Sequence, residues 1–70
     1  MADVEPHPGV RELFHRLNNQ FGVILAHAEL IEARTTDETS RSRAAQIVSK
    51  LLAARETVTE LRGLVQPPEA

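Results

Sequence analysis

The stretch FHRLNNQFGVILAHAELI, from Phe14 to Ile31, decides the fold. Its apolar residues recur at alternating intervals of three and four, the period of one face of an α-helix. The residues on this face are Phe14, Leu17, Phe21, Ile24, Ala28 and Ile31. The same spacing is a heptad repeat, so this face is expected to pack against other helices. Leu13, Leu25 and Leu30 widen the apolar stripe, and a wide stripe favours a bundle interior over a two-stranded coil.

The second half of the chain repeats the pattern after a polar connector. Four residues there favour the N-cap of a following helix: Thr36, Asp37, Thr39 and Ser40. That helix has its apolar period at Ala44, Ile47, Leu51, Ala54, Val58, Leu61 and Val65, and Pro67 and Pro68 end it. We therefore predict an all-α fold, an antiparallel two-helix hairpin within residues 10–66. Its helices span about 9–34 and about 40–65, with a connector at 35–40, an irregular N-terminus at 1–9 and a tail at 67–70.

The short length of the chain favours association with a second copy on energetic grounds, and we predict a homodimer. In a chain below about 70–80 residues, a single hydrophobic core rarely supplies more than about 3–5 kcal/mol of folding stability. The chain has 70 residues and no cysteine, so disulfides and thiolate metal sites are excluded. Its three histidines have no regular spacing, and we expect neither a metal nor a cofactor. One hairpin cannot cover two wide stripes, whereas two hairpins can do so as a four-helix bundle.

The charge pattern excludes other classes of function. The net charge is −2 with both signs mixed, and no basic stripe points to nucleic acid. No run approaches the roughly 20 apolar residues that a membrane span needs. The N-terminal residues lack the charged and apolar regions of a signal peptide. We therefore expect a soluble, cytoplasmic protein.

A polar cluster near the start of the first helix is the candidate site. His15 follows the core residue Phe14, so its side chain is expected to point sideways or outwards. Residues three and four apart share a helix face. The face of His15 therefore carries Arg11, Glu12, Asn18 and Asn19, and further along Gly22 and Ala26. Because Gly22 and Ala26 have little or no side chain, another protein could approach this face closely. We therefore interpret these residues as a docking surface.

An exposed neutral imidazole is a nucleophile near pH 7 and can accept a phosphoryl group. Arg16 could balance the charge of that group, and Asn19 could hold a water or a phosphoryl oxygen. The simpler alternatives are a surface histidine, solvated asparagines, and an Arg16 that pairs with Glu12 or Gln20. His27 is expected to be a boundary residue. The arginines of the second helix are expected to be solvated, or alternatively to hold an acidic partner: Arg41, Arg43 and Arg55.

The segment HRLNNQFGVILAHAELI resembles the phosphoacceptor box of bacterial sensor histidine kinases. The family's box has a histidine, an acidic residue, Leu-Asn-Asn and then an apolar helix, and the resemblance covers about residues 11–32. It implies a hairpin domain that dimerises into a four-helix bundle. It also implies that His15 is the phosphoacceptor, and that Asn19 helps position water for dephosphorylation of a receiver domain.

Two departures from the family change the expected activity. Arg16 stands where the family has an acid that acts as general base, and arginine cannot take up a proton. The chain also has no glycine-rich nucleotide loop and no ATP-binding domain, so we do not expect it to phosphorylate itself. The resemblance then implies a stand-alone phosphotransfer or receiver-docking module. Its partner would be a response-regulator receiver domain or a histidine kinase acting in trans.

Three alternatives remain open from the sequence. The chain could be a catalytically silent dimerisation scaffold, or an inhibitor of a kinase or receiver, derived from a histidine kinase. It could be a fragment of a complete kinase. Outside signalling, it could be a generic four-helix assembly protein, for which the face around His15 would have no special role.

Overall fold

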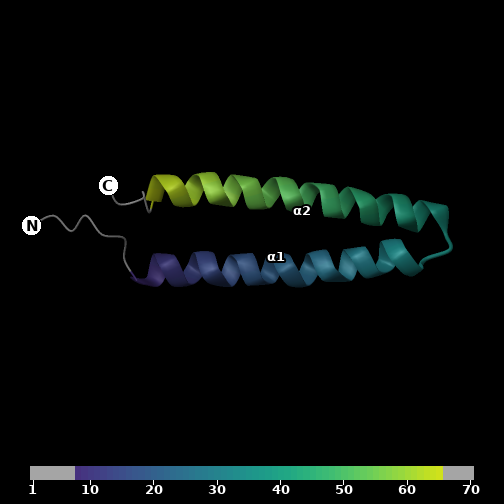
Figure 1. Ribbon diagram of the computed structural model, residues 1–70, viewed down its shortest axis with the longest axis horizontal. Helices are drawn as coiled ribbons and strands as arrows, with labels where there is room; N and C mark the ends of the chain where they lie inside the picture. Colours follow the sequence, from purple (N-terminus) through teal and green to yellow (C-terminus); the bar gives the residue numbers. More distant parts are fainter. Residues whose placement is uncertain (1–7, 66–70) are drawn as a thin grey trace, which may run out of the picture.

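The computed structural model describes residues 8–65, which form two long helices side by side (Figure 1). Helix α1 spans Pro8–Arg34 and helix α2 spans Glu38–Val65, and they run antiparallel. Each is about 40 Å long at a rise of 1.5 Å per residue. The predicted all-α hairpin is confirmed, and its assembly into a four-helix bundle stays a prediction. The predicted tail at 67–70 and most of the predicted irregular N-terminus lie outside the described residues.

Helix α1 begins at Pro8, one residue before the predicted start at about residue 9. Pro8 and Gly9 are both helical, so the irregular N-terminus predicted at 1–9 does not extend to these two residues. Proline is favoured in the first turn of a helix because the N–H that it lacks would have no partner there, and its ring fixes a helical φ. The apolar period that begins at Phe14 therefore starts inside an established helix, nearly two turns after Pro8.

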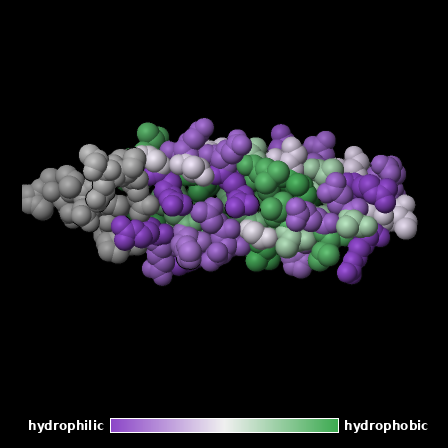
Figure 2. Space-filling view, in the orientation of Figure 1, coloured by the Kyte–Doolittle hydropathy of each residue, from purple (hydrophilic) through white to green (hydrophobic). Residues whose placement is uncertain are grey.

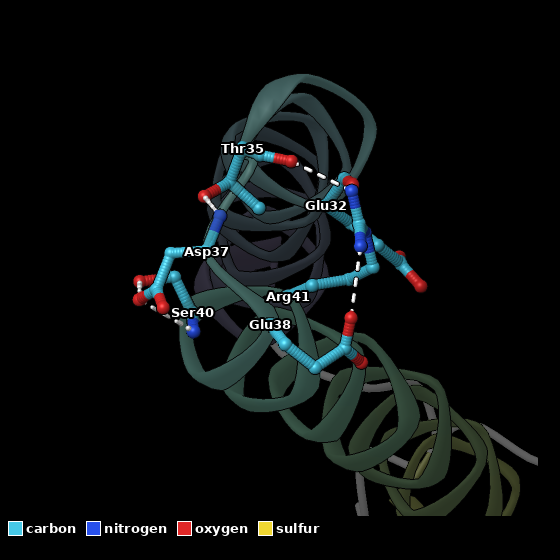
Figure 3. Close-up of polar contacts among 6 residues, drawn as sticks. All are labelled: Glu32, Thr35, Asp37, Glu38, Ser40 and Arg41. Carbon is cyan, nitrogen blue, oxygen red and sulfur yellow. Dashed lines mark hydrogen bonds and ion pairs between the residues drawn. The ribbon is translucent and has the colours of Figure 1, made fainter.

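The connector comprises residues 35–37, so the predicted connector at 35–40 is too long by three residues. Asp37 caps α2: its Oδ2 accepts hydrogen bonds from the Ser40 hydroxyl at 2.7 Å and the Ser40 backbone N–H at 3.2 Å (Figure 3). The Thr35 hydroxyl in turn accepts a bond from the Asp37 N–H at 3.1 Å. Because Asp37 is the cap, residues 38–40 form the first turn of α2. The bonds from Ser40, its hydroxyl first, lower the pKa of Asp37.

Arg41 ties the two helices together at the turn. Its guanidinium donates a hydrogen bond to the carbonyl of Thr35 at 2.7 Å and a long one to the carbonyl of Glu32 at 3.5 Å (Figure 3). It also pairs with the Glu38 carboxylate at 3.0 Å. The last carbonyls of a helix have no partner within the helix, and here a side chain from α2 supplies it. The expectation that Arg41 is simply solvated was therefore wrong.

The core uses only half of each predicted heptad stripe. Within residues 8–65, the buried apolar side chains are Phe14, Ala28, Ala44, Leu51 and Val58. Ala28 and Ala44 are the most enclosed, at 2% and 1% exposure, which fits two helices that approach closely towards the turn. The alternate heptad positions are exposed or half-buried, and we call them the uncovered row: Leu17, Ile24 and Ile31 of α1, with Ile47, Ala54 and Leu61 of α2.

Candidate functional site

His15 lies about two turns into α1 with its side chain exposed. Its neighbour Phe14 is buried between the helices, and successive helical residues are about 100° apart, so the imidazole points off the core. It forms no hydrogen bond or ion pair with any residue of the described range 8–65. The imidazole is therefore available to an incoming group, as the sequence predicted.

Asn19 and Arg16 are also exposed, but they stand in different relations to His15. Asn19 is four residues on, about 40° around the helix and one turn along, so the two side chains share a face. Arg16 is about 100° from His15, towards the outer side of α1. Neither Glu12 nor Gln20 pairs with Arg16 among the residues that the structure describes. Its guanidinium can therefore swing towards an anion held near the imidazole.

The expected docking surface is largely exposed, with one exception. Arg11, Glu12, Gly22 and Ala26 are exposed, whereas Asn18 is half-buried. Asn18 lies four residues after Phe14, so it shares the side of α1 that turns towards α2. The prediction that grouped Asn18 with the outer face therefore needs correction. The exposed members of the expected docking surface are the other four residues, together with His15 and Asn19.

Gly22 leaves bare backbone in the middle of this surface. A Cβ added there would meet nothing within 4 Å, so packing within the hairpin does not require glycine. Glycine costs about 1 kcal/mol relative to alanine in a helix interior. Among residues 8–65, no contact of the hairpin offsets this cost.

The visible side of the hairpin is polar at both ends. Figure 2 shows hydrophilic side chains towards both ends of the described part, with a hydrophobic patch between them. A shallow groove on α2 is lined by apolar, polar and charged residues: Leu52, Arg55, Glu56, Thr59 and Glu60. Of these residues, the sequence analysis named only Arg55. Such a groove gives no period or motif, so sequence reasoning had no signal for it.

Two classes of site find no support in the described part of the chain. No group of three or more histidine or acidic side chains in residues 8–65 is arranged to hold a metal ion. Neither α1 nor α2 has the length of apolar sequence that crossing a bilayer requires.

Comparison with known proteins adds no relative. No family model matches the chain, and neither curated proteins nor solved structures give a match.

Proposed function

We propose that the chain is a stand-alone histidine phosphotransfer module of two-component signalling, with His15 as the phosphoacceptor and a receiver domain as its partner. The observation that carries this proposal is an exposed imidazole with no polar partner in residues 8–65, on the same face of α1 as the bare backbone of Gly22, about two turns further along. The resemblance of residues 15–31 to the histidine kinase box supports the same assignment. We propose that the module works as a homodimer.

The proposed step transfers a phosphoryl group from a phospho-aspartate of the receiver to His15. The lone pair of the unprotonated ring nitrogen attacks phosphorus, an N–P bond forms, and the P–O bond to the aspartate breaks. The receiver's carboxylate leaves, and the imidazole N–H proton passes to water. No base is needed to begin this step, because the neutral imidazole already offers a lone pair near pH 7.

Arg16 and Asn19 would assist by different means. The Arg16 guanidinium would balance the charge of the phosphoryl oxygens through charge-assisted hydrogen bonds. The Asn19 amide, one turn from His15, would donate a hydrogen bond to a phosphoryl oxygen or position a water. Arg16 suits transfer from a partner better than self-phosphorylation, which in the resembling family uses an acid at this position.

The docking surface supports a protein partner over a small molecule. Gly22 and Ala26 continue the face of His15 along α1 with little side-chain bulk. A second helix can approach such a face closely, while Arg11 and Glu12 flank it with charge. The approach of a folded partner would exclude water from His15 during the transfer.

The test is transfer of radiolabelled phosphate from phosphorylated receiver domains to the purified chain. We expect acid-labile, base-stable label on the wild type and none on His15→Gln. The matched control is His27→Gln, which removes another exposed histidine of α1 and should keep the label. Label on His15→Gln would refute the assignment of His15.

The second candidate is a silent docking scaffold, which Arg16 in the place of the family's acid favours. It predicts no label on any variant but measurable binding of a receiver or a kinase. Binding by His15→Gln at wild-type affinity, together with unlabelled wild type, would select this scaffold function.

A further inference from the structure

One row of residues on α2 reaches across the hairpin towards α1. Its members recur at intervals of seven, so they share one side of the helix, and we call them the lateral row: Arg41, Val48, Arg55 and Arg62. Arg41 shows where the row points, because its guanidinium bonds to the carbonyls of Glu32 and Thr35 at the end of α1 (Figure 3). Val48, the next member, is half-buried, as the same orientation requires. The two remaining arginines therefore leave α2 on the side that faces α1.

The register of the two helices at the turn places the lateral row along α1. The helices are antiparallel, and Glu32 meets Arg41 next to the turn. Equal numbers of heptads from that contact bring two further pairs level with each other: Asn18 with Arg55, and Arg11 with Arg62. Helices packed side by side have axes about 8–10 Å apart, and Arg41 already crosses that gap at the turn. Arg55 and Arg62 can therefore reach side chains of α1 at these levels.

His15 lies between these two levels on the same flank. It is four residues after Arg11 and three before Asn18, and residues three and four apart share a helix face. One arginine of α2 is thus level with the turn of α1 before His15, and the other is level with the turn after it. The side chains of Arg55 and Arg62 bracket the imidazole from the opposite helix.

The arginines on this flank have no counter-ion in the described part of the chain. Arg11, Arg55 and Arg62 are exposed, and none of them forms an ion pair within residues 8–65. The neighbouring acids lie on the outer sides of the two helices: Glu12, Glu56 and Glu60. Guanidinium groups at the same level repel each other, and an anion between them removes this repulsion. The planar fork of N–H donors in arginine matches the oxygens of a phosphate.

We propose that Arg55 and Arg62 form an oxyanion site that holds the phosphoryl group on His15. The inference rests on the proposed role of His15 as the phosphoacceptor. Arg16 leaves α1 about 100° from His15, towards the outer side, whereas the two arginines of α2 lie on the flank to which the imidazole belongs. The phosphoryl oxygens accept charge-assisted hydrogen bonds from both guanidiniums, and Arg11 adds a third positive charge. Helix α2 thus supplies the charge balance, and α1 supplies the nucleophile.

The test uses phosphoramidate, a small phosphoryl donor that needs no receiver. The imidazole nitrogen attacks phosphorus, an N–P bond to histidine forms and the P–N bond of the donor breaks. Ammonia leaves and takes the imidazole N–H proton as ammonium. The internal reference is His27, which is exposed and lies three residues after Ile24, so it shares the flank of the uncovered row. NMR of the imidazole signals gives the labelling rate at each histidine.

We expect His15 to be labelled at least about fivefold faster than His27, because one exposed charge-assisted contact is worth up to about fivefold. Arg55→Gln combined with Arg62→Gln should lower the rate at His15 by at least about fivefold and leave the rate at His27 within about twofold. The matched control combines Arg43→Gln with Lys50→Gln. It also removes two exposed cations seven residues apart, on the other side of α2, and should leave both rates within about twofold.

Two results would overturn the oxyanion site. One is an unchanged rate at His15 in the variant that lacks Arg55 and Arg62. The other is an equal loss of rate in the two double variants, which would reflect net charge alone. Circular dichroism should show the same helicity in all of these proteins, since the substituted side chains are exposed.

Transfer from a receiver distinguishes this inference from the proposed function. Receiver transfer to His15 at the same rate with and without Arg55 and Arg62 would keep the phosphoacceptor and overturn the oxyanion site. Phosphoramidate labelling of His15 that depends on the two arginines, without transfer from any receiver, would support the oxyanion site and overturn the proposed partner.

Discussion

Removal of the Arg41 guanidinium should measure how much the tie at the turn stabilises the hairpin. The bond to the Thr35 carbonyl is short and charge-assisted, at 2.7 Å, and such bonds contribute about 1.5–3 kcal/mol. The Arg41 side chain is 43% exposed, so water competes and the lower end of that range applies. The pair with Glu38, whose side chain is 83% exposed, adds at most about 0.5 kcal/mol. The bond to the Glu32 carbonyl, at 3.5 Å, adds little.

Arg41→Ala should therefore lower the free energy of unfolding by about 2 kcal/mol. For a domain of this size that corresponds to a fall in Tm of about 8–16 °C. The assay is thermal unfolding by circular dichroism at one fixed protomer concentration, since association also shifts Tm.

The control for this substitution is Arg43→Ala. Arg43 is exposed on the same helix and has no polar contact with another described residue, so its loss should change stability by less than about 0.5 kcal/mol. Glu38→Gln isolates the ion pair and should lower Tm by no more than about 4 °C. If Arg41→Ala and Arg43→Ala melt within about 2 °C of each other, the Arg41 bonds do not stabilise the hairpin in solution and the reasoning fails.

Three further substitutions test other parts of the structure. Gly22→Ala should raise Tm by about 4–8 °C, because the added Cβ meets nothing within 4 Å. It should also weaken binding of the proposed receiver partner, whereas Gly63→Ala should leave that binding unchanged. Equal effects of the two substitutions on binding would show that Gly22 is not part of the proposed docking surface. Leu51→Ala should lower the free energy of unfolding, measured by chemical denaturation, by about 2–5 kcal/mol, because Leu51 is buried. Leu52→Ala, at the exposed neighbouring position, should lower it by less than about 1 kcal/mol. Similar losses for the two variants would show that Leu51 is not part of the core. The pKa of Asp37 is lowered from its ordinary 3.8, so its stabilisation is present above about pH 4 and is lost as the pH falls through the folded-state pKa. Between about pH 7 and about pH 2.5, the Tm of Asp37→Asn should therefore fall less than the Tm of the wild type. An equal fall in Tm would show that the hydrogen bonds from Ser40 to Asp37 do not persist.

The fold could be predicted because its determinants are periodic. Phe14 and Ile24 belong to one heptad stripe, and that period alone identifies a packed helix. The same period cannot say which residues a hairpin buries by itself, because either row of the stripe satisfies it. The structure makes this division, with Phe14 buried and Ile24 exposed.

The turn was less predictable because it depends on single side chains. Asp37 was one of four possible caps, and a choice among neighbouring polar residues depends on backbone geometry at the connector. Arg41 bonds to carbonyls six and nine residues away, a contact that no local pattern encodes. Likewise, the exposure of His15 followed from its place beside Phe14, whereas the burial of Asn18 required knowing on which side α2 lies.

The short connector also governs the order in which the hairpin assembles. A connector of residues 35–37, held by Asp37 and Arg41, brings the end of α1 and the start of α2 together at the smallest loop-closure entropy in the chain. Contacts near Phe14 and Val58, by contrast, have a low loop-closure entropy cost only after the turn has closed. We therefore expect the helices to join from the turn towards the open end and to separate in the reverse order. The open end carries His15, so we expect the proposed phosphoacceptor to lie in the part of the hairpin that opens first and refolds last.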